Sequence, residues 1–537
     1  MRVSRVGNRK PNSVGQNKAT ADRSAGYNSL MQAGRLYLNG QWKSSQQTIA
    51  VTNPATGESF ATVSTATRQE VHQAIADAHA AFASWRELPA IKRADYLLAA
   101  ASEMNRRAED IARTITLENG KPIVQSRGEV AVAVDHFRWF AEECRRAYGR
   151  VIPNQIAGKR HLVIKTPIGV VGAISPWNFP LFLAARKVAP ALAAGCPVIL
   201  KPSEITPLCA IQMAECLDAA KIPPGVFQLV VGDAPMIGEE FLTNPLVRKI
   251  TFTGSTAVGR KLIAGAAAQI KPLSLELGGH APGLVFDDAD LDRTIEQIIA
   301  AKFRNTGQSC IALNRLYVQK GIYDKLISRL VPRVAQMKIG NGLDEGVEIG
   351  PLINERAMEK AIAHIEDAIK RRAKLLCGGK RWGSANHEDR GWRMEDSNAG
   401  SANSLRSSIL DPQSSIRAGF FLVPTILENV PPDALCMNEE TFAPVLPIAR
   451  FEKEEDAIVM ANSSVYGLSS YAFTTNIDRM WRLAEKIEAG MIGINDGVPS
   501  TSNAPFGGVK QSGWGRELAS EGLEEFLEVK HVSIAAG

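Results

Sequence analysis

Hydrophobic and polar residues follow two different rhythms along this chain of 537 residues. Over roughly 68–85, 90–119 and 126–146, apolar residues recur every three or four positions, which predicts amphipathic helices. Before them, alternating apolar residues flank Asn39 and Gly40, a pair typical of a tight β-hairpin turn. The pattern therefore predicts a hairpin followed by an all-helical opening.

A different rhythm begins near residue 161, where short segments rich in β-branched residues alternate with Ala-rich segments of helix length. Parallel strands need such crossover helices, so this rhythm predicts an α/β fold with a Rossmann-like, doubly wound sheet. The uncharged stretch 167–185 is long enough for a membrane helix, but its prolines favour a buried strand followed by a loop. The strand candidates are 168–174, 197–201, 226–231, 249–253 and 281–285.

A second α/β pattern runs from Cys310 to about residue 513, with helices expected at 323–337 and 357–371. Between 383 and 417 it is interrupted by a stretch rich in Ser and Asn without apolar periodicity, which predicts an exposed insertion. The last apolar segment, at 527–532, predicts an edge strand available for pairing with another subunit.

Composition narrows the class of protein. Hydrophobic residues make up 45% of the chain and charged residues 22%, as in soluble globular enzymes, and the length predicts two or three domains. The net charge of +6 is small for this length and no sustained basic block occurs, so no nucleic-acid partner is expected. The seven cysteines and eight histidines are scattered without metal-ligand spacing, which predicts a reducing compartment and no metal site.

Residues 1–34 differ from the rest, since several Arg and Lys residues accompany a single acidic residue, Asp22, among Ser, Asn and Gly. This composition is that of a disordered extension or of a targeting peptide. We therefore expect a cytoplasmic protein without a membrane partner, or a protein of the mitochondrial matrix if the extension is a transit peptide.

Cys310 and Glu276 are candidates for a nucleophile and its base. A thiol that attacks a carbonyl needs a group that accepts its proton, and Gly278 and Gly279 allow backbone and ligand to approach closely. The alternative for a single cysteine is a buried small hydrophobic residue. Asn178 follows a predicted strand between two prolines, so its amide can be oriented toward an oxyanion; alternatively, it caps a turn.

Two further loops follow predicted strands and could contact a nucleotide. Lys201 and Glu204 stand at the carboxyl end of one strand, where open α/β sheets bind nucleotides, although such residues are usually solvated. Gly254 and Ser255 open a predicted helix, whose N-terminal amides suit a pyrophosphate. The usual GxGxxG fingerprint is absent, so an ordinary glycine-rich turn is the alternative.

These motifs occur in one order along the chain: SPWNFP, LKPSE, FTGSTAVG, LELGG and FRNTGQSC, followed by EETFAP and PFGGVKQSG. Over about 36–532 the chain thereby resembles the NAD(P)-dependent aldehyde dehydrogenase superfamily. The resemblance implies that Cys310 attacks an aldehyde carbon, that the Asn178 amide and the Cys310 backbone N–H hold the oxyanion, and that a hydride passes to a nicotinamide. Glu276 would activate the water that hydrolyses the resulting thioester.

The resemblance also implies roles for other positions. Lys187 and Glu517 match a proton relay, and Ala443 stands where the family usually has Gly. The implied cofactor contacts are Ser175, Trp177, Asn178, Lys201, Ser203, Glu204, Gly254, Ser255, Gly259, Leu277, Glu440 and Phe442. The implied domains are an NAD(P)-binding domain at 35–144 and 168–279, a catalytic domain at 280–515, and a small β oligomerisation element at 145–167 and 516–537, giving a dimer or tetramer.

Within the superfamily the chain is most similar to succinate-semialdehyde dehydrogenases, through 301–318 and 349–354. Arg186 and Arg304 match positions that line the substrate tunnel, where two guanidinium groups would bind a carboxylate unless one of them pairs with a protein carboxylate. A further hydroxyl for that carboxylate would come from Ser500 or Thr501.

Two departures limit this likeness. Ala312 stands where some succinate-semialdehyde enzymes have a second cysteine, so no disulfide is expected at the site. His280 replaces a common Asn or Lys, which leaves the chain length of the semialdehyde open. Glutarate or 2-oxoglutarate semialdehyde, or a broad range of aldehydes, are the alternative substrates. Glu204 favours NAD, because a carboxylate accepts from a 2′-hydroxyl and repels a 2′-phosphate, while Lys201 would still tolerate NADP.

Other activities fit the motifs less well. A CoA-acylating dehydrogenase would not need Glu276 as a base, and a Cys-dependent esterase or hydrolase would normally use a His, which no motif supplies for Cys310. A crystallin-like structural protein would require the loss of site residues, and none is lost.

Overall fold

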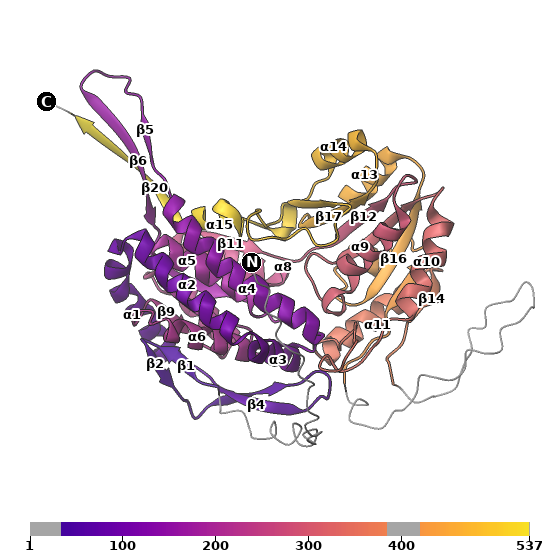
Figure 1. Ribbon diagram of the computed structural model, residues 1–537, viewed down its shortest axis with the longest axis horizontal. Helices are drawn as coiled ribbons and strands as arrows, with labels where there is room; N and C mark the ends of the chain where they lie inside the picture. The colour runs from indigo at the N-terminus through magenta and orange to yellow at the C-terminus, as the bar shows by residue number, and fades with distance from the viewer. Residues whose placement is uncertain (1–33, 384–418, 536–537) are drawn as a thin grey trace, which may run out of the picture.

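The computed structural model describes residues 34–383 and 419–535. Apart from Gly34 and Gly383, the predicted N-terminal extension and the predicted insertion lie outside the described residues. Within them, no helix is both long enough and apolar enough to cross a membrane. Figure 1 shows two α/β bodies and a narrow β-sheet arm that projects from the first body.

The first body is built on an eight-stranded sheet with the order β19-β11-β10-β7-β8-β9-β1-β2. The strands from β11 to β9 are parallel, which confirms the predicted Rossmann-like sheet. Asn39 and Gly40 both have positive φ (48° and 75°), so the predicted hairpin closes one edge of the sheet. The strands are β1 (Leu36–Leu38), β2 (Gln41–Lys43), β7 (Val170–Ile174), β8 (Val198–Lys201), β9 (Phe227–Leu229), β10 (Val247–Thr253), β11 (Leu273–Glu276) and β19 (Gly513–Trp514).

Two expectations for the opening of the chain were wrong. The segment 90–119 forms two helices, because the backbone of Arg107 leaves helical geometry (φ −97°, ψ 14°) while its side chain bonds to Glu103 and Glu215. The opening is also not all-helical, since β3 (Thr48–Thr52) and β4 (Ser59–Ser64) form a second antiparallel pair. The helices of this body are α1 (Arg68–Glu87), α2 (Ala90–Arg106), α3 (Ala108–Asn119), α4 (Ile123–Glu143), α5 (Phe182–Ala194), α6 (Leu208–Ala219), α7 (Ala234–Thr243) and α8 (Thr256–Ala266).

The second body holds a seven-stranded sheet with the order β14-β15-β16-β13-β12-β17-β18. The segment 281–285, grouped by its sequence pattern with the strands of the first sheet, instead pairs with β13 and β17 here. Its strands are β12 (Ala281–Val285), β13 (Leu313–Gln319), β14 (Lys374–Cys377), β15 (Thr425–Glu428), β16 (Val445–Phe451), β17 (Ser469–Phe473) and β18 (Met491–Ile494). The later helices are α9 (Leu291–Phe303), α10 (Tyr323–Ala335), α11 (Glu355–Lys370), α12 (Leu435–Asn438), α13 (Glu454–Asn462), α14 (Ile477–Lys486) and α15 (Ala519–Glu524).

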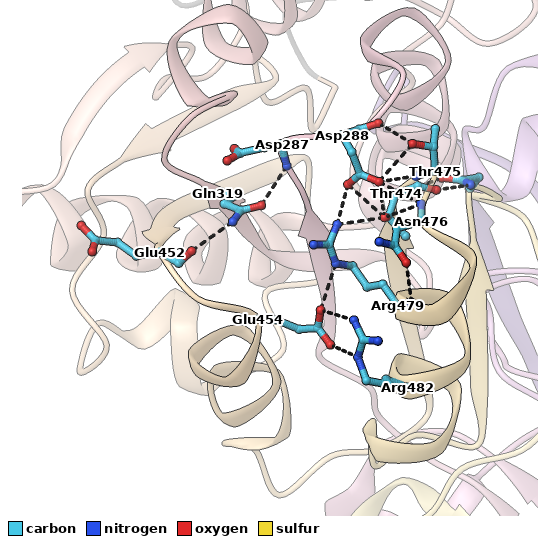
Figure 2. A network of polar contacts seen from close by, with 11 residues as sticks. Asp287, Asp288, Gln319, Glu452, Glu454, Thr474, Thr475, Asn476, Arg479 and Arg482 are labelled. Carbon is cyan, nitrogen blue, oxygen red and sulfur yellow. Dashed lines mark hydrogen bonds and ion pairs between the residues drawn. The ribbon is translucent and has the colours of Figure 1, made fainter.

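A polar network joins the ends of β12 and β17 to helices α13 and α14 (Figure 2). The Asp288 carboxylate accepts hydrogen bonds from the Thr474 hydroxyl, from the backbone N–H of Asn476 and from Arg479. Arg479 also bonds to Glu454 on α13. Because one carboxylate closes the turn after β17 and one arginine ties the two helices together, the network fixes this side of the second sheet.

The arm consists of β5 (Arg150–Ile152), β6 (Lys159–Pro167) and β20 (Leu527–Ala535) in the order β20-β6-β5. The predicted C-terminal edge strand is β20, and one of its edges pairs with β6 along its whole length. Its other edge has no partner strand among the described residues. Apolar side chains on the arm remain in solvent, including Val151 (75% exposed) and Val529 (66% exposed).

Candidate active site

Cys310 lies where two cavities of the protein meet, because it lines both of them. One cavity, of about 480 Å³, follows the carboxyl ends of the first sheet's strands. The other, of about 300 Å³, lies between α4, α5 and the segment around Ser500. A reactive group between two pockets can meet two different ligands, one from each side.

The segment that carries Cys310 is strained and tightly held. Asn305 and Thr306 are fully buried and have positive φ (50° and 57°), which is costly for residues with side chains. The Asn305 amide donates to the Asn178 carbonyl at 2.7 Å, and the Thr306 hydroxyl donates to the Gly350 carbonyl at 3.1 Å. Beyond the cysteine, the Tyr471 hydroxyl donates to the Ile311 carbonyl at 2.6 Å. These bonds fix the position of Cys310, the candidate nucleophile.

The Cys310 thiol is held in its neutral form. Burial, with a further contribution from the carboxylate of Glu440, raises its pKa to about 12. The positive charge of Arg186 acts in the opposite direction but does not compensate. The thiol must therefore lose its proton as it reacts, because only the thiolate is strongly nucleophilic.

Glu276 ends β11, and the charges of Glu517, Lys187, Arg186 and Arg516 act on it. Burial, and then the negative charge of Glu517, raise its pKa well above the ordinary value, while Lys187 and Arg186 act in the opposite direction. Its Oε2 atom has no hydrogen-bond partner among the described residues. Glu517 contacts Lys187 at 2.5 Å and Arg186 at 3.4 Å. The predicted base and the predicted relay pair thus belong to one buried cluster.

The larger cavity has the features that a dinucleotide requires. Ser255 caps α8 by accepting from the Val258 N–H at 3.4 Å, and the other amides at the start of this helix could bind a negatively charged group. A Cβ atom on Gly259 would lie only 2.6 Å from Leu277, so glycine permits α8 to pack against the loop after β11. The buried Thr253 hydroxyl is without a partner among the described residues. Of the predicted cofactor contacts, the lining includes Trp177, Asn178, Gly254, Ser255, Leu277, Glu440 and Phe442.

The other predicted cofactor contacts, Ser175, Lys201, Ser203, Glu204 and Gly259, do not line this cavity. Lys201 ends β8 and its Nζ atom lies 2.6 Å from Oε2 of Glu204. In the wall of the cavity, the Glu440 carboxylate accepts from the Gly279 N–H at 3.0 Å, and burial raises its pKa to about 7. The cavity therefore has a titratable carboxyl in its wall, whereas the charged pair of Lys201 and Glu204 lies outside its lining.

The smaller cavity contains both predicted arginines and Ser500. The Arg186 guanidinium lies 4.8 Å from the ring of Phe182 and 4.4 Å from that of Phe506, and it also contacts Glu517. Arg304 lies 4.9 Å from the ring of Phe179 and has no ion pair among the described residues. Arg304 is therefore the positive charge left for an anionic ligand, whereas the charge of Arg186 is partly balanced.

Thr501 does not reach this cavity: its side chain is exposed and donates to Asn503 at 2.9 Å. The sequence reasoning also missed the rings of Phe179, Phe182 and Phe506, which wall the cavity. Phe179 and Phe182 had a signal, since they stand three positions apart where α5 begins. The spacing of Phe506, which follows Pro505, gave no sign that its ring would line this cavity.

Known proteins match this chain over almost its whole length. The model of the aldehyde dehydrogenase family matches residues 42–397 and 393–532. The chain is 44% identical to the succinate-semialdehyde dehydrogenase [NADP(+)] GabD of Escherichia coli, over 93% of this chain and 97% of the relative. It is 44% identical to a glutarate-semialdehyde dehydrogenase of Pseudomonas aeruginosa, with the same coverage. The crystal structure of succinate-semialdehyde dehydrogenase from Burkholderia pseudomallei is 42% identical, with a TM-score of 0.87 over 96% of this chain and all of that one. Sequence, fold and the order of the motifs agree, and the chain belongs to the aldehyde dehydrogenase family.

Proposed function

We propose that this enzyme oxidises an aldehyde that carries a carboxylate at its other end, and that succinate semialdehyde is its substrate. The observation that supports this most directly is Arg304, an arginine without an ion pair among the described residues, in the same 300 Å³ cavity as Cys310. A guanidinium group forms paired, charge-assisted hydrogen bonds with a carboxylate. Ser500 and Arg186 in the same cavity supply further donors. Relatives named for succinate and glutarate semialdehydes support the same class.

In the first half of the proposed reaction, Sγ of Cys310 bonds to the aldehyde carbon and the thiol proton leaves. The carboxylate form of Glu276 can accept this proton, since its charge acts on the Cys310 thiol. The negative charge that develops on the aldehyde oxygen is held by the Asn178 side-chain amide and the Cys310 backbone N–H, and such a donor accelerates reactions by about 10²–10³-fold. Residues that line the 480 Å³ cavity, among them Trp177, Ser255 and Glu440, would hold NAD(P)+, which would supply the acceptor for the hydride of the former aldehyde carbon; Cys310 would then carry a thioester.

In the second half, Glu276 takes a proton from water while the water oxygen attacks the thioester carbonyl. The bond between that carbon and Sγ breaks, the acid is released, and the thiol regains its proton. Glu276 must be a carboxylate for this step, although burial and Glu517 favour its protonated form. Lys187 and Glu517, in contact at 2.5 Å, provide a buried pair through which the proton of Glu276 can be exchanged.

We propose NAD+ as the preferred cofactor because of Glu204, as the sequence suggested. The contact of Lys201 with Glu204 at 2.6 Å balances this carboxylate, however, so the preference should be modest and NADP+ should also be used. The name of the Escherichia coli relative, which specifies NADP(+), agrees with tolerance of a 2′-phosphate. Comparison of kcat/KM for the two cofactors tests this, and a strong NADP+ preference would contradict it.

Glutarate semialdehyde is a second candidate, and a specific feature favours it. A third cavity, of about 750 Å³, shares Gln125, Arg304 and Val498 with the substrate cavity. A longer semialdehyde could therefore extend along Arg304 toward this outer space. We expect activity with both semialdehydes.

The assembly and location are also proposals. The unpaired edge of β20 and the exposed apolar side chains of the arm support a homo-oligomer, either a dimer or a tetramer, formed through the arm. The domain division predicted from the resemblance is proposed unchanged. We propose a cytoplasmic location, or the mitochondrial matrix if residues 1–34 direct import.

The substrate proposal is tested by NADH production with succinate semialdehyde, glutarate semialdehyde and butanal, which lacks the carboxylate. Arg304→Ala should lower kcat/KM for the two semialdehydes by about 10- to 100-fold, the loss of a charged hydrogen bond, and leave butanal unchanged. Arg186→Ala should lower it less, since Glu517 already shares that charge. In Arg304→Ala, an equal loss for butanal, or no loss for either semialdehyde, would contradict the assignment. Addition of CoA, and an ester substrate without cofactor, would reveal the rival activities.

A further inference from the structure

The backbone carbonyl oxygen of Asn178 accepts hydrogen bonds from several side chains at once. Lys121 donates to it from 2.7 Å and Asn305 from 2.7 Å. A weaker donor, Asn119, lies at 3.4 Å. These donors come from the α3–α4 connection of the first body and from the nucleophile's own segment, so two distant parts of the chain meet at one oxygen.

The segment that ends at Cys310 also orients the Asn178 side chain. Its Nδ2 atom donates to the Gln308 carbonyl at 3.2 Å, and Asn305 donates to that carbonyl as well, also at 3.2 Å. The Asn178 backbone and side chain are thereby both tied to the segment that ends at Cys310. A fixed peptide plane sets the direction of the Cα–Cβ bond, and with it the position of the amide.

The donor Lys121 is itself held by a buried ion pair. Its Nζ atom lies 2.6 Å from Oε2 of Glu129, and neither side chain is exposed to solvent. Lys121 also lies 4.0 Å from the ring of Phe179, on which Arg304 packs too. A buried charge pair is costly and an apolar pair of similar size is often at least as stable, so its presence here calls for a reason other than stability.

Glu129 connects this pair to the substrate cavity. Its second oxygen, Oε1, accepts from the backbone N–H of Leu181 at 2.9 Å and of Phe182 at 3.4 Å, and so satisfies amides at the start of α5. Helix α5 carries Arg186 and Lys187. One carboxylate thus holds both the lysine that bonds to Asn178 and the helix that carries the anion-binding and relay residues.

We propose that Lys121 and Glu129 are positioning residues, which hold the Asn178 amide where the oxyanion forms and keep it in register with α5. The proposal rests on the oxyanion role of Asn178 given above. It predicts that loss of the pair slows the steps in which a carbonyl oxygen becomes negative and leaves other reactions of Cys310 unaffected.

Two reactions of Cys310 distinguish an effect on the oxyanion from a general loss of thiol reactivity. Acylation by 4-nitrophenyl acetate, followed as a burst of nitrophenol without cofactor, forms an oxyanion, whereas alkylation by iodoacetamide forms none. Lys121→Met should slow the acylation burst and lower kcat by about 10- to 100-fold, while alkylation stays within about twofold of the native rate. Lys271→Met is the matched control, since Lys271 is also buried and donates to backbone carbonyls, those of Phe241 and Asn244, outside both cavities. This control should leave both rates unchanged.

A double-mutant cycle with Asn178→Ala identifies the route of the effect. If Lys121 acts through the Asn178 amide, Lys121→Met should add no further loss to Asn178→Ala. Losses that multiply, or an equal fall in alkylation, would show general damage and overturn the proposal. An Asn178→Ala variant with a full acylation burst would overturn the oxyanion role itself, whereas a slow Asn178→Ala with a fast Lys121→Met would overturn only the positioning role.

Lys121→Met leaves the Glu129 carboxylate buried without its partner, and this could prevent folding. The double variant Lys121→Met/Glu129→Gln has no unpaired charge and retains an oxygen that can accept from the Leu181 N–H. It should melt near the native temperature and still show the slow acylation burst. A native burst rate in the folded double variant would overturn the proposal.

Discussion

The Nζ atom of Lys187 lies 2.5 Å from Oε1 of Glu517, and both side chains are buried. Burial raises the pKa of Glu276 most, and this pair then adjusts it, because the carboxylate of Glu517 raises the pKa further and the ammonium of Lys187 lowers it. The base of the proposed reaction is thus adjusted by a neighbouring pair rather than by a direct partner of its own.

Removal of the negative charge of Glu517 should therefore shift the pH dependence of kcat. In Glu517→Gln the pKa of Glu276 falls, so its carboxylate persists to lower pH and the acidic limb of the kcat profile should move down by about one pH unit. Lys187→Met should move the same limb upward. Steady-state kinetics between pH 5.5 and 9 would check both shifts, and a limb that stays in place in both variants would contradict the coupling.

The raised pKa of the Cys310 thiol should be visible in the pH dependence of its alkylation. With a pKa of about 12, the thiolate fraction of the protein without cofactor should rise about tenfold per pH unit, and the rate of iodoacetamide alkylation should rise with it from pH 7 to pH 10 without a plateau. Arg186→Ala should slow alkylation at each pH, because this positive charge lowers the pKa of the thiol. A plateau below pH 9 would mean that the thiol is already activated.

A second buried carboxyl should affect stability. Glu118 accepts from the backbone N–H of Leu208 at 2.7 Å and of Cys209 at 3.0 Å at the start of α6, and burial raises its pKa to about 7. Because the folded pKa lies above the unfolded one, folding favours the protonated form. Stability should therefore fall as the pH rises from about 4.5 to 7 and then stay constant, by on the order of 3 kcal/mol.

Glu118→Gln removes this titration but keeps an oxygen for the two N–H groups. Relative to the native protein, the variant should gain melting temperature at pH 8 and gain little at pH 5. Thermal melts followed by circular dichroism at the two pH values would check this. An equal change in melting temperature at pH 5 and pH 8 would indicate that the substitution acts through packing and not through titration of Glu118.

The arm offers a test of the proposed assembly. Val529→Glu places a charge on the exposed apolar surface of β20 and should convert the assembly to smaller species, as seen by sedimentation velocity. Val124→Glu is the control, since Val124 is also exposed (71%) but lies at the start of α4. The same shift in both variants would indicate general destabilisation.

The motifs could predict that the candidate site residues lie together, because most of these motifs follow a strand. Parallel strands end at the same edge of a sheet, so Asn178 after β7 and Glu276 at the end of β11 had to lie on one side of the first sheet. The backbone break at Arg107 was not predictable from apolar spacing, because α2 and α3 continue the same apolar periodicity on both sides of it. The contact of Tyr471 with the Ile311 carbonyl could not be predicted either, since it joins residues that are 160 positions apart in the sequence.

The predictions for the substrate cavity were more uneven. Arg186, Arg304 and Ser500 all line it, but sequence proximity alone could not decide between Ser500 and Thr501. Adjacent residues of an irregular segment point in different directions, and only the fold determines which of them faces the ligand. The aromatic walls around the arginines were missed because spacing reveals a helix face and not the cavity that it borders.

The turn at Asn305 and Thr306 has a practical consequence for anyone who wishes to give this enzyme a new substrate. Arg304, the proposed contact for the substrate's carboxylate, and Cys310, the proposed nucleophile, flank a short segment in which Asn305 and Thr306 are left-handed and hydrogen-bonded, so the two residues cannot be moved independently. Insertions, deletions or loop grafts there would disturb the chemistry together with the selectivity. Libraries should instead diversify Ser500, Val132 and Phe182, which border the same cavity from other parts of the chain.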